Sequence, residues 1–138
     1  MSGKAFLDTN ILVYAADRSE PAKSKAARDL VSRLAQEGTP CISTQVAQEF
    51  FVTVTRKMGV APLAARDLVL ALKGFEHVVV DFEDIQAAIE GHILWRVSFW
   101  DALIVTAARK AQCAVLYTED LSDGQIFGGL RVVNPFGV

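Results

Sequence analysis

Short apolar runs alternate along the chain with longer segments whose apolar residues recur at helical spacing. The short runs end at polar or turn residues, which is typical of strands. Strands are predicted at KAFL (4–7), TPCIS (39–43), HVVVD (77–81), CAVLYT (113–118) and LRVVNPF (130–136). The segment LSDGQIFGG (121–129) is expected to be a loop.

Helix start and stop residues bound the longer segments. Asn10 is expected to cap a short helix in NILVYAAD, and Pro21 opens a second helix that Gly38 ends. Further helices are predicted from Ser43 or Thr44 to about Lys57, from Pro62 to Gly74, over FEDIQAAIEGHILWR (82–96), and from Ser98 to about Gln112. The last of these is apolar on most sides and is therefore expected to be buried.

Alternating strands and helices imply right-handed βαβ crossovers. We therefore expect the α/β class, with a mainly parallel sheet covered by helices on both faces. A chain of 138 residues suits one domain with a real core, and no repeat, linker or low-complexity segment divides it. The prediction is a single three-layer α/β/α domain over residues 1–138.

Composition adds two expectations about surroundings. The hydrophobic share is 51% and the mean hydropathy is +0.28, so a partner or second copy is expected to cover some apolar surface. No apolar run is long enough to span a bilayer and MSGKAFLDTN lacks a signal-peptide pattern, which predicts a cytoplasmic protein without membrane contact. Cys41 and Cys113 are expected to be reduced core thiols.

Four acidic residues lie against apolar or strand-like segments instead of in solvated charge runs: Asp8, Glu49, Asp101 and Asp120. Ionised carboxylates are rarely buried without a cation or a hydrogen-bond network. In a parallel sheet, ligands bind beyond the carboxyl ends of the strands. Asp8 and Asp120 follow strands, and Glu49 and Asp101 lie in early helical turns, so all four are expected at one edge of the sheet.

Each acid also has a simpler explanation. Asp8 suits a turn at a strand end, Glu49 a solvated helix face, and Asp101 a capping box with Ser98. Asp120 suits a turn in TEDLSDG. Glu119 or Asp123 could then be the functional acid in its place.

Oxygen-only ligands favour Mg²⁺ or Mn²⁺ over zinc or copper. Such ions activate water and stabilise the leaving oxygen in phosphodiester hydrolysis. His77 and His92 are expected to be structural or surface residues. The net charge of −2, from 14 basic and 16 acidic residues, argues mildly against a nucleic-acid binder, but divalent cations on several carboxylates would reverse the local field.

The motifs together resemble a known family. DTN after the first strand, the mid-chain Glu49, FWDA at a buried helix start and the closing TED resemble the PIN-domain nucleases. DTNILVYA, FWDALI and LYTEDLSDGQ…GLRVVNPF are similar to the VapC-type toxin ribonucleases of toxin–antitoxin pairs. The resemblance covers essentially the whole chain.

That resemblance implies a PIN-like fold and an Mg²⁺- or Mn²⁺-dependent endoribonuclease that acts on RNA. It also implies a cognate antitoxin that holds the enzyme inactive, and usually a homodimer. Asp8, Glu49, Asp101 and Asp120 would be the acidic quartet, with Asp8 and Asp101 as the more direct ligands of one or two ions. Side chains that would orient these carboxylates are Thr9, Asn10 and Thr118.

Other side chains are candidates for contacts with partners. Basic candidates for RNA contact are Lys23, Lys25, Arg28, Arg33, Arg56, Lys57 and Arg96. Phe51, Trp95 and Trp100 could meet a second copy or an antitoxin, although each also suits core packing. Two alternative functions stay open: a non-catalytic PIN-like interaction module, and an enzyme that transfers phosphate through a strand-end aspartate.

Overall fold

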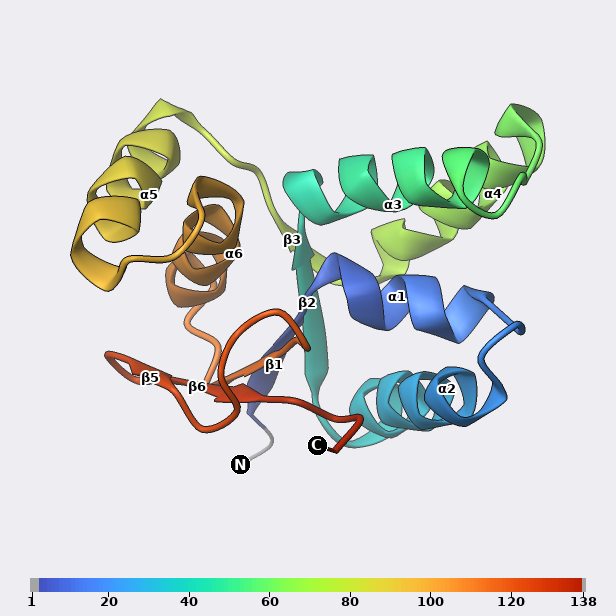
Figure 1. Ribbon diagram of the computed structural model, residues 1–138, viewed down its shortest axis with the longest axis horizontal. Helices are drawn as coiled ribbons and strands as arrows, with labels where there is room; N and C mark the ends of the chain where they lie inside the picture. The colour runs from blue at the N-terminus through green and yellow to red at the C-terminus, as the bar shows by residue number, and fades with distance from the viewer. Residues whose placement is uncertain (1–2, 138) are drawn as a thin grey trace.

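Residues 3–137 of the computed structural model are described, and their six strands form one sheet in the order β3-β2-β1-β4-β6-β5 (Figure 1). The strands are β1 (Lys4–Leu7), β2 (Thr39–Ser43), β3 (Glu76–Val78), β4 (Val115–Tyr117), β5 (Ile126–Phe127) and β6 (Leu130–Val133). All neighbours pair in parallel except β5 and β6, which are antiparallel. The register places Phe6 of β1 opposite Cys41 of β2 and Leu116 of β4.

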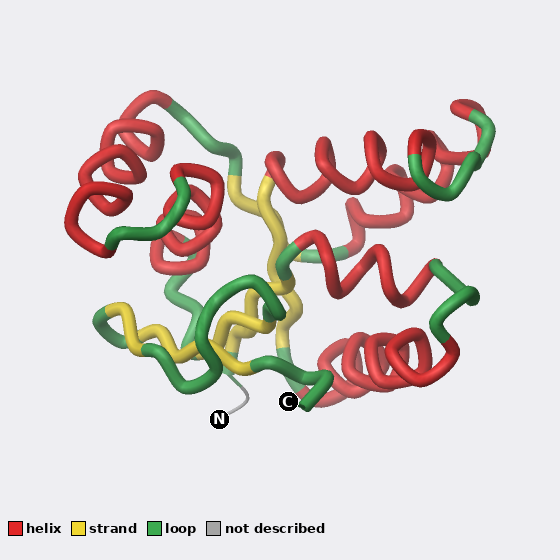
Figure 2. Tube along the Cα trace, in the orientation of Figure 1, coloured by secondary structure: helices red, strands yellow, loops and turns green. Residues whose placement is uncertain are grey.

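The helices lie on both faces of this sheet. One side of the central strands carries α1 (Thr9–Ala16), α2 (Pro21–Glu37), α3 (Thr44–Arg56) and α4 (Pro62–Ala71), as Figures 1 and 2 show. The other side carries α5 (Phe82–Trp95) and α6 (Phe99–Lys110). A short 3₁₀ helix, Leu72–Gly74, follows α4. The predicted α/β class with a mostly parallel sheet is therefore confirmed.

The strand order reverses direction between β1 and β4. The chain steps outward from β1 to β2 and β3, then returns through α5 and α6 to pair β4 on the other side of β1. Right-handed crossovers in opposite directions put their helices on opposite faces, which leaves a crevice at the carboxyl ends of β1 and β4. This topology fixes where a site can form.

One apolar cluster joins the sheet to its helices, and a smaller one joins two helices of one layer. The main cluster includes Phe6, Leu7, Ile11 and Leu116, all fully buried between the sheet and its helices. A smaller cluster of Ala88, Ala102 and Leu103 packs α5 against α6. This second cluster supports the first turn of α6, which carries Asp101.

Most helix ends agree with the sequence prediction. Pro21 begins α2 and Gly38 caps its end, while Ser43 and Ser98 accept backbone N–H bonds at the starts of α3 and α6. The cap of α1 differs, because Asp8 and not Asn10 is the cap and the helix already begins at Thr9. Cys41 and Cys113 are buried free thiols, and both histidines are exposed, as expected.

Three strand predictions need correction. The predicted strand 77–81 is Glu76–Val78, because Asp81 instead forms a capping box with Asp84 at the start of α5. The strands predicted at 113–118 and 130–136 are also shorter, at Val115–Tyr117 and Leu130–Val133.

The segment predicted as a loop at 121–129 contains β5. Ile126 and Phe127 pair with Arg131 and Leu130 around a two-residue turn. Gly128 supplies the positive φ of 65° that such a hairpin turn requires. In the described part of the chain, no helix combines the length and apolar character needed to cross a bilayer.

Candidate metal centre

Asp8 is a buried carboxylate held at the carboxyl end of β1. Its backbone N–H donates to Tyr117 O of β4 at 3.1 Å, which ties the two strand ends together. Its Oδ1 accepts from the backbone N–H of Thr9 at 2.7 Å, and its Oδ2 accepts from the Thr118 hydroxyl at 2.8 Å. With only 5% of Asp8 exposed, these bonds fix the side chain in one orientation.

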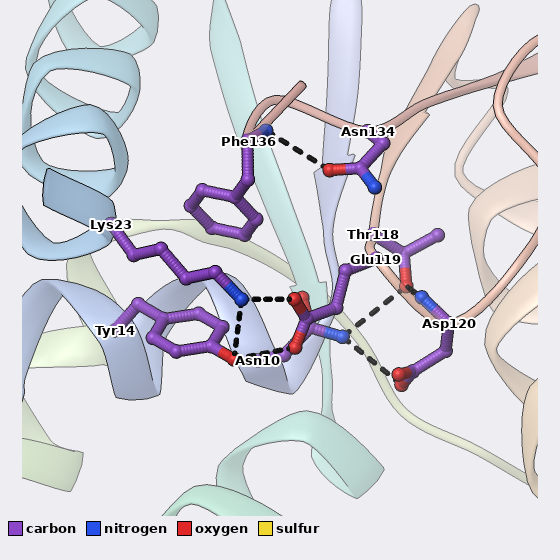
Figure 3. Close-up of polar contacts among 8 residues, drawn as sticks. All are labelled: Asn10, Tyr14, Lys23, Thr118, Glu119, Asp120, Asn134 and Phe136. Atoms are coloured by element: carbon purple, nitrogen blue, oxygen red, sulfur yellow. Dashed lines mark hydrogen bonds and ion pairs between the residues drawn. The ribbon is translucent and has the colours of Figure 1, made fainter. Parts of the chain in front are cut away.

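A hydrogen-bond network joins Asp8 to Asp120 just beyond the end of β4. The Thr118 hydroxyl donates to Asp8 and accepts from the backbone N–H of Asp120 at 3.0 Å. The Asn10 carboxamide donates to Thr118 Oγ1 at 3.3 Å and to Asp120 Oδ2 at 3.0 Å (Figure 3). The turn after β4 is thereby folded so that the Asp120 carboxylate returns toward Asp8.

Asp101 enters the same region from the other helical layer. It lies in the first turn of α6, and its backbone N–H donates to the Ser98 hydroxyl at 3.0 Å. An acidic side chain is favoured at this end of a helix because the exposed N–H groups carry partial positive charge. Carboxylate oxygens of Asp8, Asp101 and Asp120 lie within 4.8 Å of one another. Three of the four predicted acids therefore converge on one point.

Glu49 lies beside this group of three without being part of it. Its two carboxylate oxygens are held separately: Oε1 accepts from the Thr9 hydroxyl at 2.6 Å and Oε2 from the Gln45 carboxamide at 3.2 Å. Gln45 is a buried contact of the site that the sequence analysis missed. Its position four residues before Glu49, on the same face of a predicted helix, was the available signal.

The charges of these acids are not balanced by side-chain cations. None of the salt bridges among residues 3–137 involves Asp8, Glu49, Asp101 or Asp120. Burial, reinforced by the charges of Asp120 and Glu49, raises the pKa of Asp8 to about 7, against the opposing bonds from Thr118 and Thr9. The same causes raise the pKa of Asp101, although the Ser98 contact partly opposes them. An oxygen-only set of this kind could hold a hard divalent cation.

Glu119 and Asp123, the alternatives to Asp120, have other partners. Glu119 accepts from the Tyr14 hydroxyl at 2.7 Å and from Lys23 Nζ at 3.1 Å, and points away from Asp120 (Figure 3). Asp123 accepts from the backbone N–H of Asn134 at 2.9 Å. Among the acids of this turn, only Asp120 belongs to the group that could hold an ion.

A hollow of about 810 Å³ is lined by residues of α1 and α3 and, among the four acids, by Glu49 and Asp120. Its charged lining consists of five acids and one base: Asp17, Glu20, Glu49, Glu119, Asp120 and Lys57. Of the other candidates for RNA contact, Lys23 pairs with Glu119 of this lining, Lys25 pairs with Asp29, and Arg28 contacts Ser24. Arg56 and Arg96 are exposed, and Arg33 lines a separate smaller hollow.

The three aromatic candidates for partner contact differ in burial. Trp95 packs its ring against Phe127, with centroids 5.0 Å apart, and joins the core. Trp100 is 61% exposed and lines the hollow, and Phe51 is 36% exposed on α3. Of the two roles expected for Trp95, core packing is therefore the one that the structure shows.

Solved structures share this fold over most of their length. A toxin–antitoxin complex from Klebsiella pneumoniae matches at 21% identity and a TM-score of 0.71, covering 97% of this chain and 99% of that one. VapBC2 from Rickettsia felis, bound to a promoter DNA fragment, matches at 19% identity and a TM-score of 0.69, covering 94% and 96%. VapC20 from Mycobacterium tuberculosis, a sarcin-ricin-loop-cleaving toxin, matches at 20% identity and a TM-score of 0.62, covering 81% and 86%.

No curated protein matches the chain significantly. The family profile of the PIN domain, in contrast, matches residues 5–122. That span begins in β1 and ends just beyond Asp120, so it includes all four acids. Because the profile matches well over half of the 138 residues of the chain, the chain belongs to the PIN domain family.

Proposed function

We propose that this protein is a divalent-metal-dependent endoribonuclease and the toxin of a toxin–antitoxin pair. The observation that carries the proposal is the convergence of Asp8, Asp101 and Asp120 within 4.8 Å at the strand-order reversal, with no neutralising salt bridge from residues 3–137. Membership of the PIN domain family supports it. Further support comes from the structural neighbours, which include toxin–antitoxin complexes and a toxin that cleaves the sarcin-ricin loop.

In this proposal Asp8 and Asp101 hold Mg²⁺ or Mn²⁺, and Asp120 and Glu49 complete the charge around it. A divalent ion in such a site lowers the pKa of water and offsets charge on a phosphodiester. Buried Asp8 supplies a fixed oxygen, since Thr118 and the Thr9 backbone set its orientation. Each carboxylate oxygen has two lone pairs, so these bonds leave room for a ligand.

The neighbouring polar side chains would keep the carboxylates in place. Asn10 holds Asp120, and Thr9 holds Glu49. Lys57 is the base that lines the hollow among the described residues, and we assign it to an RNA phosphate. Transfer of phosphate through Asp8 has less support, because its side chain is buried, which hinders attack of the carboxylate on a phosphorus atom.

The test is cleavage of structured and unstructured RNA by the purified chain with Mg²⁺ or Mn²⁺. Asp8→Asn and Asp101→Asn should each lower the rate by roughly 100-fold or more, since each replaces a charged carboxylate by a neutral amide and removes several kcal/mol of charge stabilisation. Asp123→Asn is the matched control, because the Asp123 carboxylate accepts from the Asn134 backbone and lies outside the group of three carboxylates, and it should cleave normally. Cleavage that survives both ligand substitutions would reject the proposal. Partner binding without any hydrolysis would favour the non-catalytic module.

We further propose that an antitoxin covers the hollow and that the chain forms a homodimer in the cytoplasm. Val52 and Trp100 line the hollow and are 47% and 61% exposed, so they offer apolar area to a partner. Light scattering after gel filtration should show two copies of the chain, and a stoichiometric complex when the antitoxin is added. Trp100→Ala should weaken that complex. A monomer that binds no antitoxin would contradict this part of the proposal.

A further inference from the structure

Gln45 lies at the point where α3, α6 and the acidic site meet. Its side chain projects from the first turn of α3 and is 5% exposed. The carboxamide nitrogen donates to Glu49 Oε2 at 3.2 Å and to the backbone oxygen of Trp100 at 3.3 Å. Trp100 directly precedes Asp101, so one side chain links Glu49 on α3 to the backbone of the first turn of α6, next to Asp101.

The orientation of this carboxamide is informative. Its oxygen, Oε1, is buried and has no hydrogen-bond partner among the described residues. Turning the amide over would place that oxygen against a carboxylate and a carbonyl, which are both acceptors, so the observed orientation is the one that serves Glu49 and α6. A buried acceptor without a partner destabilises the fold. Stability alone therefore does not account for a glutamine here.

Asn10 shows the same arrangement on the other side of the site. Its nitrogen donates to Asp120 (Figure 3), and its oxygen is likewise buried with no hydrogen-bond partner in residues 3–137. Both carboxamides thus direct N–H groups at acids and leave their oxygens unbonded. Thr9 and Gln45 hold the two oxygens of Glu49 separately, which prevents rotation of that carboxylate.

We infer that Gln45 is a positioning residue of the metal centre, which sets the place of Glu49 relative to Asp101. It acts through Glu49 and the start of α6 and does not itself bind the ion. This inference rests on the proposed function, because it assigns a role within that same site. Supporting partners of ligating side chains commonly change metal affinity by roughly 10- to 100-fold.

The experiment measures Mn²⁺ affinity by titration calorimetry, with thermal unfolding measured on the same samples. Gln45→Met keeps the volume but removes the donor, and it should weaken Mn²⁺ binding by roughly tenfold or more. Because it also removes the unpartnered oxygen, its Tm should stay within about 5 °C of wild type. Gln48→Met is the matched control: Gln48 lines the same hollow from the same helix but is exposed, and its affinity should change less than about twofold.

A double variant tests whether Gln45 acts through Glu49. Glu49→Gln should itself weaken binding, and adding Gln45→Met to it should cause a clearly smaller further loss than Gln45→Met causes alone, since coupled residues are not additive. Wild-type affinity in Gln45→Met, or a fully additive loss in the double variant, would overturn the inference. If Gln45→Met does not fold, Gln45→Ala is judged by the same criteria.

The outcomes separate this inference from the proposed function. A wild-type chain that binds Mn²⁺ but cleaves no RNA would reject the ribonuclease, while the Gln45 affinities would still decide its positioning role. If the wild-type chain cleaves RNA and Gln45→Met binds Mn²⁺ as tightly as wild type, only the positioning role of Gln45 is rejected. A wild-type chain that binds no Mn²⁺ would remove the metal centre and the role of Gln45 together.

Discussion

At the scale of single residues, the raised pKa of Asp8 makes stability depend on pH. Its pKa lies near 7 in the folded chain, against an ordinary 3.8, because it is buried among other acids. The folded state therefore holds the proton more tightly than the unfolded state. The resulting stabilisation is complete below about pH 4 and is lost as the pH rises through about 7.

The free energy of unfolding of the metal-free protein should therefore fall between pH 4 and pH 7. The difference in pKa corresponds to up to about 4 kcal/mol, and Asp101 contributes in the same direction. Urea denaturation across this range is the measurement, and Asp8→Asn should flatten most of the slope. Saturating Mn²⁺ should also oppose the loss, since an ion binds the deprotonated acids. A slope that is unchanged in Asp8→Asn would contradict this account.

Two adjacent acids, Glu119 and Asp120, give a second residue-scale prediction. Asp120 lies in the group of three carboxylates, whereas Glu119 is bound to Tyr14 and Lys23. Asp120→Asn should weaken Mn²⁺ binding by roughly tenfold or more, and Glu119→Gln should leave it within about twofold. Calorimetric titration of both variants checks this. An equal loss of affinity in the two variants, or a larger loss in Glu119→Gln, would show that Glu119 shares or takes the role assigned to Asp120.

Sequence alone could not choose between these two acids. The choice depends on the turn after β4, where the Thr118 hydroxyl accepts from the backbone N–H of Asp120. That contact and the Lys23 ion pair come from tertiary packing, which local propensity does not encode. The four acids as a set were accessible, because strand ends and early helical turns in a parallel sheet share an edge.

At the scale of elements, caps and prolines made helix boundaries predictable. Ser43, Ser98, Pro21 and Pro62 mark starts through local hydrogen bonds or a fixed φ. Short strands were less predictable, because β3 and β4 have three residues each and β5 has two. Pairing with a neighbour defines such strands more than their own pattern does.

The cap of α6 links stability to the site. Ser98→Ala removes the acceptor of the Asp101 backbone N–H and should destabilise the chain by about 1 kcal/mol. It should also weaken Mn²⁺ binding, because the first turn of α6 carries Asp101. Denaturation and calorimetry measure the two effects, and Ser98→Thr, which retains a hydroxyl, should restore both. Loss of stability with unchanged affinity would mean that the cap does not position Asp101.

At the scale of the whole molecule, the chain carries a net charge of −2, and most of the charged side chains that line the hollow are acidic. Binding of RNA in the hollow would then depend on few basic side chains. Among residues 3–137, Lys57 is the basic residue that lines the hollow. Lys57→Ala should weaken RNA binding without divalent ions and lower its salt slope by about 1. Fluorescence anisotropy measures this, with Lys73→Ala as a control outside the hollow. Equal behaviour of the two variants would place the RNA path elsewhere.

The central claim is that side chains distant in sequence form one divalent-cation site at the carboxyl edge of the sheet. The most direct measurement is anomalous diffraction from crystals containing Mn²⁺. The account predicts a peak at bonding distance from carboxylate oxygens of Asp8 and Asp101, with Asp120 beside it, and no such peak in Asp8→Asn crystals. Saturating Mn²⁺ with no peak at these carboxylates, or a peak only elsewhere, would contradict it.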